Sequence, residues 1–72
     1  MTNPRVRTAR GRDGGMIRVG DSVSLVDGTI VRVVEMWRQG ANGTIVRTDA
    51  APDPEYPDHH QAAARDMKRV TS

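Results

Sequence analysis

Residues 16–48 alternate apolar and polar side chains with the period of two that is typical of β-strands. The pairs Gly20-Asp21 and Asp27-Gly28 are turn signals, and the polar residues 38–42 read as a loop. The strands that we expect between these breaks are residues 16–19, 22–26, 29–37 and 43–48. Short strands separated by glycine turns predict a mainly β fold, in which an antiparallel sheet curls into a small barrel.

A short internal repeat supports this division into strands. Residues 27–32 read Asp-Gly-Thr-Ile-Val-Arg, and residues 42–47 read Asn-Gly-Thr-Ile-Val-Arg. In both copies a pair that tolerates positive φ precedes the start of a β-branched strand. Two copies are too few for a solenoid, so we interpret them as two equivalent strand openings.

The turn at Asp27-Gly28 determines which side chains share a face of the predicted sheet. A type I′ turn at this position pairs Leu25 with Ile30. The face expected to line the interior then carries Val23, Leu25, Ile30, Val34 and Met36. The opposite face is more apolar than a solvated surface needs, so we expect it to form a protein interface. The interface residues on that face are Val26, Val31, Val33, Trp37 and Val46. One β-bulge would exchange the two faces in the part of the sheet that follows it.

Residues 1–15 show neither helical nor strand periodicity, and they contain three glycines. We predict a flexible basic arm for this segment. Its cationic side chains are Arg5, Arg7, Arg10 and Arg12. Such a segment is either a disordered leader or an arm that becomes ordered when its arginines meet carboxylates or phosphates on a partner.

Residues 49–58 contain three of the four prolines, which predicts a stiff connector. Asp58, followed by Gln61 three positions later, has the spacing of a helix N-cap and its capping box. We therefore predict a short helix over residues 59–70. Twelve residues make a marginal helix in isolation. Its thin apolar stripe, which includes Met67 and Val70, is expected to contact a protein partner.

Composition sets limits on how stable such a chain can be. Only 36% of the 72 residues are hydrophobic, and most of them lie in residues 16–48. A core of this size is marginal without a disulfide, a metal or a partner, and the chain contains no cysteine. We therefore expect the protein to complete its structure on a partner's surface. The chain lacks a signal peptide and a long apolar run, so we expect a cytoplasmic or virion-associated protein outside membranes.

The formal charge changes sign along the chain. Residues 1–15 carry +3, residues 16–48 carry +1 and residues 49–72 carry −2. A basic beginning and an acidic end favour directional electrostatic contacts, for example contacts between the head of one molecule and the tail of another.

Residues 19–25 (Val-Gly-Asp-Ser-Val-Ser-Leu), followed by residues 28–34 (Gly-Thr-Ile-Val-Arg-Val-Val), resemble the opening of SH3-like small barrels of the KOW and Tudor kind. That opening is a hydrophobic residue, Gly-Asp, alternating valines and then Gly-x-Val on the next strand. The resemblance covers residues 16–48 and implies binding of nucleic acid, peptide or protein without catalysis. Two features of such families are missing here. Trp37 is the only aromatic residue of this region, so there is no aromatic cage, and there are no lysine-rich loops.

The candidate chemistry outside this region is sparse. The adjacent His59 and His60 lie near three carboxylates, but side chains of neighbouring helical residues project about 100° apart. No other histidine and no cysteine is available to complete a zinc site, so we predict no metal and no cofactor. The serines and threonines occur without a nucleophile-elbow motif or a base at a suitable spacing, so we expect a protein without enzymatic activity.

These patterns favour a structural or adaptor protein that docks on a larger protein assembly or on further copies of itself. In its most specific form, this hypothesis describes a minor capsid, cement or connector protein of a bacterial virus. The alternative is a small nucleic-acid-binding protein in which the arginines of residues 1–15 contact phosphates. A third hypothesis is a free regulator with a single protein partner, which the sequence does not separate from the first. No small-molecule substrate is expected.

Overall fold

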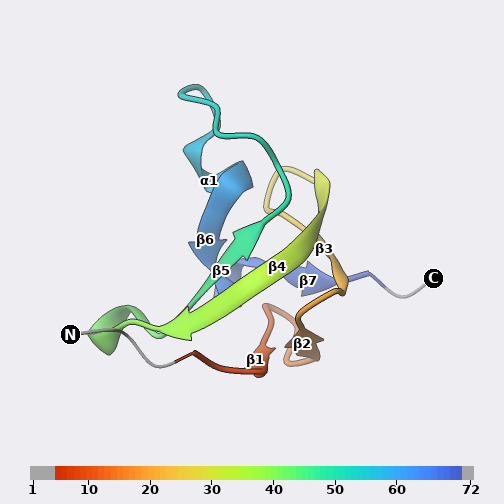
Figure 1. Ribbon diagram of the computed structural model, residues 1–72. Coiled ribbons are helices and arrows are strands. Elements are labelled where there is room, and N and C mark those ends of the chain that lie inside the picture. The colour runs from red at the N-terminus through yellow and green to blue at the C-terminus, as the bar shows by residue number, and fades with distance from the viewer. Residues whose placement is uncertain (1–4, 71–72) are drawn as a thin grey trace.

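The computed structural model describes residues 5–70, which form mainly antiparallel β structure (Figure 1). The strands are β1 (Thr8–Arg10), β2 (Met16–Arg18), β3 (Ser22–Ser24), β4 (Ile30–Arg38), β5 (Thr44–Thr48), β6 (Gln61–Ala63) and β7 (Lys68–Arg69). The helical elements are the α-helix α1 (Pro57–His60) and the 3-10 turns η1 (Gly40–Asn42) and η2 (Ala64–Asp66). Five strands form one sheet in the order β6-β5-β4-β3-β7, while β1 and β2 form a separate hairpin. The expectation of a mainly β fold is confirmed.

The expected barrel is not formed, because β6 and β7 are the edges of an open sheet. In a flat five-stranded sheet these edges would be about 19 Å apart. The five steps from Ala63 to Lys68 reach at most about 18 Å even when fully extended, so the sheet must curl for the chain to pass between the edges.

The turn between β3 and β4 differs from the expected one by a single residue. The Leu25 N–H donates to the Thr29 carbonyl at 2.8 Å, and the Gly28 N–H donates to the Leu25 carbonyl at 2.9 Å. Gly28 has a φ of 91°, whereas no non-glycine residue of the described chain has a positive φ. This is a type I turn followed by a left-handed glycine, and not the type I′ turn, which needs positive φ at both central residues. Val23 therefore pairs with Val31, and Ser24 with Ile30.

A shift of one residue moves every side chain of a strand to the other face of the sheet. Val31 and Val33 are consequently buried, while Ile30 and Val34 are exposed, so the expected assignment of faces is wrong in this part of β4. A bulge between Val33 and Glu35 then changes the alternation again. The resulting core consists of Ala9, Ile17, Val23, Leu25, Val31, Val33, Met36, Val46, Ala64 and Met67.

The N-terminal segment belongs to the folded domain and is not a separate flexible arm. β1 pairs with β2 so that Ala9 lies opposite Ile17, and both side chains are buried. The Gly11 backbone lies so close to Met67 that a Cβ atom at Gly11 would stand 2.7 Å from the Met67 carbonyl oxygen. Glycine at this position thus allows the hairpin to approach the C-terminal segment. Residues 1–4 of the predicted arm lie outside the described residues.

The predicted helix over residues 59–70 is also wrong. The helix α1 ends at His60, and its N-cap is Tyr56 with Pro57 in the first turn, so Asp58 does not cap it. From Gln61 onward the chain pairs with β5 through β6, and then with β3 through β7. Pairing and burial outweigh a weak helical preference here, because Met67 gains a fully buried position between η2 and β7.

Candidate functional site

The outer face of the β1–β2 hairpin presents two arginines to solvent. Because Ala9 and Ile17 point into the core, the alternation of the strands turns Arg10 and Arg18 outward. These arginines are diagonal neighbours in the ladder, since Arg10 pairs with Met16, two residues before Arg18. Diagonal neighbours lie about 7–8 Å apart, so the two guanidinium groups can contact a single extended anion.

The turn of the hairpin brings in cationic residues from the other end of the chain. The Arg12 N–H donates to the Met67 carbonyl at 2.6 Å, so Arg12 lies beside the start of β7. Arg69 of β7 lies 3.6 Å from the Asp21 carboxylate, which also accepts the Arg18 N–H at 2.9 Å. We call Arg10, Arg12, Arg18, Lys68 and Arg69 together the basic face; Lys68 and Arg69, which are neighbours in β7, project from opposite sides of that edge strand. All five residues are exposed.

Most of the basic face has no acidic partner within the described chain. The ion pairs within residues 5–70 join Glu35 to Arg5 and to Arg47, Asp21 to Arg69, and Asp27 to His59. Arg10, Arg12, Arg18 and Lys68 take part in none of these pairs. Their charges are therefore available to an anion from outside the molecule.

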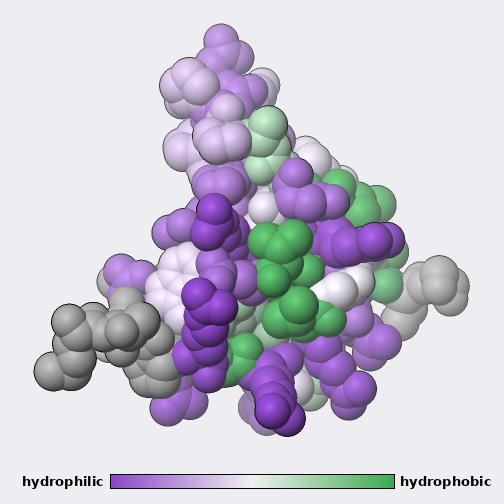
Figure 2. Space-filling model, in the orientation of Figure 1, coloured by the Kyte–Doolittle hydropathy of each residue, from purple (hydrophilic) through white to green (hydrophobic). Residues whose placement is uncertain are grey.

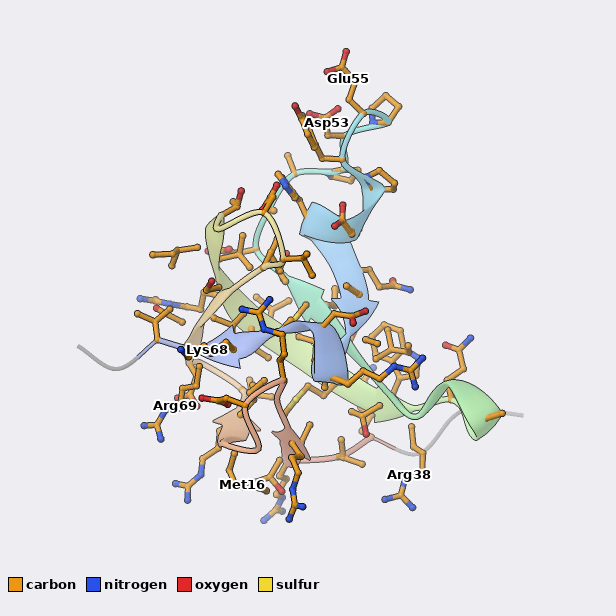
Figure 3. The ribbon with its side chains drawn as sticks, turned by 180° about the vertical axis from the view of Figure 1, so that it is seen from behind. Met16, Arg38, Asp53, Glu55, Lys68 and Arg69 are labelled. Atoms are coloured by element: carbon orange, nitrogen blue, oxygen red, sulfur yellow. The ribbon has the colours of Figure 1, made fainter. Side chains whose placement is uncertain are left out.

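Charge is segregated between two ends of the molecule. Residues 5–21 and 64–70 together contain eight cationic and three acidic side chains, a net charge of +5. Residues 49–60 contain four acidic and no lysine or arginine side chains, a net charge of −4 if the histidines are neutral. Figure 3 shows Asp53 and Glu55 at the tip of the proline-rich loop, with Met16, Lys68 and Arg69 toward the opposite end.

A second polar cluster ties the proline-rich loop to the sheet. The His59 Nε2 atom lies 2.6 Å from an Asp27 carboxylate oxygen and 3.5 Å from the Thr29 hydroxyl. The backbone N–H of Thr29 and then the His59 side chain lower the pKa of Asp27 from its usual 3.8 to about 2. Tyr56 stacks on His59, with 4.8 Å between the ring centroids.

This second cluster has the residue types of a catalytic triad without its arrangement. In a triad, the carboxylate and the nucleophile contact different nitrogens of the histidine ring. Here Asp27 and Thr29 both approach the same atom, Nε2, so the ring cannot pass a proton from the hydroxyl toward the carboxylate. The contacts instead fix the position of α1 against the turn between β3 and β4.

Thr48 completes the attachment of this loop. Its buried hydroxyl donates to the His59 carbonyl, lies 3.3 Å from the His60 carbonyl, and accepts the Ala50 N–H at 3.2 Å. His60 Nδ1 in turn lies 3.0 Å from the Ala50 carbonyl. Beside it is a shallow hollow of about 290 Å³, lined by Pro52, Asp53, Pro54, Pro57 and His60. No group of three or more metal-ligating side chains occurs in the described part of the chain.

The residues expected to form a protein interface are separated by the fold. Val31, Val33, Val46 and Met67 belong to the core and are unavailable to a partner. Val26 is exposed at the turn before β4, and Val70 is half-buried. Trp37 is half-buried, and its Nε1 donates to the Gln39 side chain at 3.0 Å.

The predicted basic arm gives a mixed outcome. Arg7, Arg10 and Arg12 are exposed, whereas Arg5 pairs with Glu35 at 3.1 Å. The contribution of Arg18, Lys68 and Arg69 was not predicted. The alternation of residues 16–18 indicates that Arg18 is exposed on a strand. Residues 68 and 69 fall within the predicted helix, and no sequence pattern indicates that they lie beside the hairpin.

Within residues 5–70, no helix has the length and apolar character needed to cross a membrane. Compared with known protein families, curated proteins and solved structures, the chain matches none of them.

Proposed function

We propose that the protein binds nucleic acid without catalysing a reaction, and that the basic face holds the phosphate backbone. The observation that carries this proposal is the convergence of Arg10, Arg12 and Arg18 with Lys68 and Arg69 from the other end of the chain. Arginine forms bidentate contacts with phosphate oxygens, and each phosphate contact releases condensed counterions.

The acidic segment does not oppose this use of the basic face. Asp53 and Glu55 lie at the far end of a molecule that measures 32 × 28 × 19 Å. The Debye length is about 8 Å at physiological salt, so repulsion between this loop and a bound phosphate chain is strongly screened. The segregated charges instead orient the protein, with the basic face toward the polyanion.

A matched pair of double variants tests the proposal. In Arg10→Ala/Arg18→Ala, two cations of the basic face are lost, whereas Arg32→Ala/Arg38→Ala removes the same charge from exposed positions of β4 that take part in none of the ion pairs given above. Binding of a labelled 20-base-pair duplex is measured by fluorescence anisotropy between 50 and 300 mM salt. If log K falls by about 0.9 per contact for each tenfold rise in salt, two lost contacts lower the slope by about 1.8. If the double variant and the unaltered protein bind equally at 1 M salt, this change of slope makes the variant bind about 60-fold more weakly at 0.1 M salt. Equal losses in both variants, or no binding by the unaltered protein, contradict the proposal.

A specific observation favours a second candidate function, docking on a larger protein assembly such as the shell of a bacterial virus. Ile30 and Val34 project outward from β4 with exposed fractions of 61% and 45%. Val19 lies alongside, because the Gly20 N–H donates to the Val33 carbonyl. Figure 2 shows apolar side chains over the middle of this face, bordered by hydrophilic ones. We call Val19, Ile30 and Val34 the apolar strip.

An adaptor that used the apolar strip would copurify with its assembly at a fixed stoichiometry. Val34→Lys would then release it, whereas Ala51→Lys, an exposed position on the proline-rich loop, would not. Release by both variants, or by neither, counts against docking through this strip.

Kinship with SH3-like small barrels also remains a proposal. It is supported by the antiparallel sheet, in which the last strand, β7, returns to pair with β3. Such kinship is compatible with either binding function.

A further inference from the structure

We infer that the ligand of the basic face is double-stranded nucleic acid, held by its backbone, and not a single strand. This inference rests on the proposed function and narrows it to one class of nucleic acid. It depends on the position of the aromatic side chains, on the fixed backbone that carries the cations, and on the charge density of a duplex.

The basic face offers no platform on which an unpaired base could stack. The chain contains one tryptophan, one tyrosine and no phenylalanine. Tyr56 belongs to the proline-rich loop at the other end of the molecule and already stacks on His59. Trp37 is half-buried near the end of β4, where it forms a bridge with Arg5 and donates to Gln39. Proteins that bind single strands combine a basic groove with aromatic side chains that stack on successive bases, and this surface supplies only the charge.

The backbone that carries the cations of the basic face is held in place by pairing and hydrogen bonds. Arg10 and Arg18 project from a paired β-ladder whose inner side is anchored by Ala9 and Ile17. The backbone of Arg12 is hydrogen-bonded to Met67, and Arg69 is oriented by Asp21. Cations on such a backbone can meet the regularly spaced phosphates of a duplex with little ordering of the ligand, whereas a flexible single strand must be ordered to bind to them.

Charge density also favours the duplex. Double-stranded DNA carries one phosphate charge per 1.7 Å of helix axis, and log K changes by about 0.9 per phosphate contact against about 0.7 for a single strand. The slopes for duplex and single strand differ by about 0.2 per contact. If all five cations make contact, log K for the duplex gains about one unit more than log K for the single strand when the salt falls from 1 M to 0.1 M. If the two ligands bind equally at 1 M salt, the duplex should bind about tenfold more tightly than the single strand at 0.1 M from this effect alone.

The experiment compares a 20-base-pair DNA duplex, a 20-base-pair RNA duplex and a 20-nucleotide single strand, all labelled and measured by anisotropy at 0.1 M salt. At least one duplex should bind about tenfold or more tightly than the single strand, and Arg10→Ala/Arg18→Ala, which leaves three of the five contacts, should reduce this difference to about fourfold. Comparison of the two duplexes shows whether the protein prefers the phosphate backbone of DNA or that of RNA. Trp37 emission should not be quenched by the single strand, and Trp37→Leu should leave duplex affinity unchanged.

The possible failures are separable. A single strand that binds as tightly as both duplexes, or that quenches Trp37, overturns this inference but leaves nucleic-acid binding intact. Failure of all three probes to bind overturns the proposed function, and this inference with it.

Discussion

Val33 and Val34 are adjacent in β4 but lie in opposite environments, so the same substitution at both positions tests the strand register. Val33 is 1% exposed and Val34 is 45% exposed. The type I′ turn expected from the sequence places Val34 inside and Val33 outside, whereas the observed turn does the reverse. We predict that Val33→Ala destabilises the protein far more than Val34→Ala.

The expected difference follows from burial. Replacing valine by alanine removes two carbon atoms, worth about 1.6 kcal/mol when fully buried, and the remaining cavity raises the cost to about 2–3 kcal/mol. At Val34, where nearly half of the residue already contacts solvent, the cost should stay below about 1 kcal/mol. A 72-residue domain has a total free energy of unfolding on the order of 4–11 kcal/mol. Val33→Ala should therefore remove a large share of it.

Urea unfolding followed by Trp37 fluorescence, together with thermal unfolding followed by circular dichroism, measures both variants. One kcal/mol shifts the midpoint of a domain of this size by about 4–8 °C, so Val33→Ala should lower Tm by about 10–20 °C. Val34→Ala should lower it by only a few degrees. An equal or larger loss in Val34→Ala would refute the observed register and favour the type I′ turn.

Three further predictions concern the termini and the loop attachment. Deleting residues 1–15 removes β1 and uncovers the core. The midpoint temperature of thermal unfolding should therefore fall by more than about 10 °C, or the transition should lose its cooperativity. An unchanged transition would mean that the segment is a free arm. The pKa of Asp27 is lowered to about 2, so its ionised form stabilises the fold above about pH 4, and this contribution is lost as pH falls through 2. Asp27→Asn should therefore weaken the dependence of the urea midpoint on pH between pH 4 and 2, and an unchanged pH profile would contradict a stabilising role for the contacts of the Asp27 carboxylate with the Thr29 N–H and with His59. Thr48→Val leaves backbone carbonyls without their buried donor and should cost about 1–3 kcal/mol in urea unfolding, while the half-buried Thr44→Val should cost much less.

The strands of the central region could be predicted because their alternation and their turns agree. Residues 22–26 and 43–48 contain β3 and β5, and residues 29–37 cover all of β4 except its last residue, Arg38. The glycines at the start of the two repeats, Gly28 and Gly43, both have positive φ. The assignment of faces failed because it depended on one choice of turn. Asp27-Gly28 is compatible with loops of two or three residues, and only the packing of Val31 and Val33 in the finished core selects between them.

The error at the C-terminus has a different physical origin. Residues 59–70 have the capping spacing and the stripe of a short helix, and local propensity offers no reason to reject one. Pairing of β6 with β5 and of β7 with β3 is non-local, so a sequence pattern read over twelve residues does not contain it. The same limit applies to the basic face, because Lys68 and Arg69 reach the hairpin only through this long-range pairing.

The expectation that the protein must complete its core on a partner counted only the apolar residues of the central segment. In the structure, the segments before and after the central region supply further apolar side chains to the core. Ala9 comes from the N-terminal segment and Ala64 and Met67 from the C-terminal one, with Val6, Ala50 and Ala62 packed against them. Because both flanks are used to bury the protein's own sheet, residues 5–15 and 57–70 are not free to lace neighbouring subunits together. What remains for recognition is the solvent-facing surface, and there the strongest organised feature is charge. This is the physical reason for ranking nucleic-acid binding through the basic face above docking by extended termini.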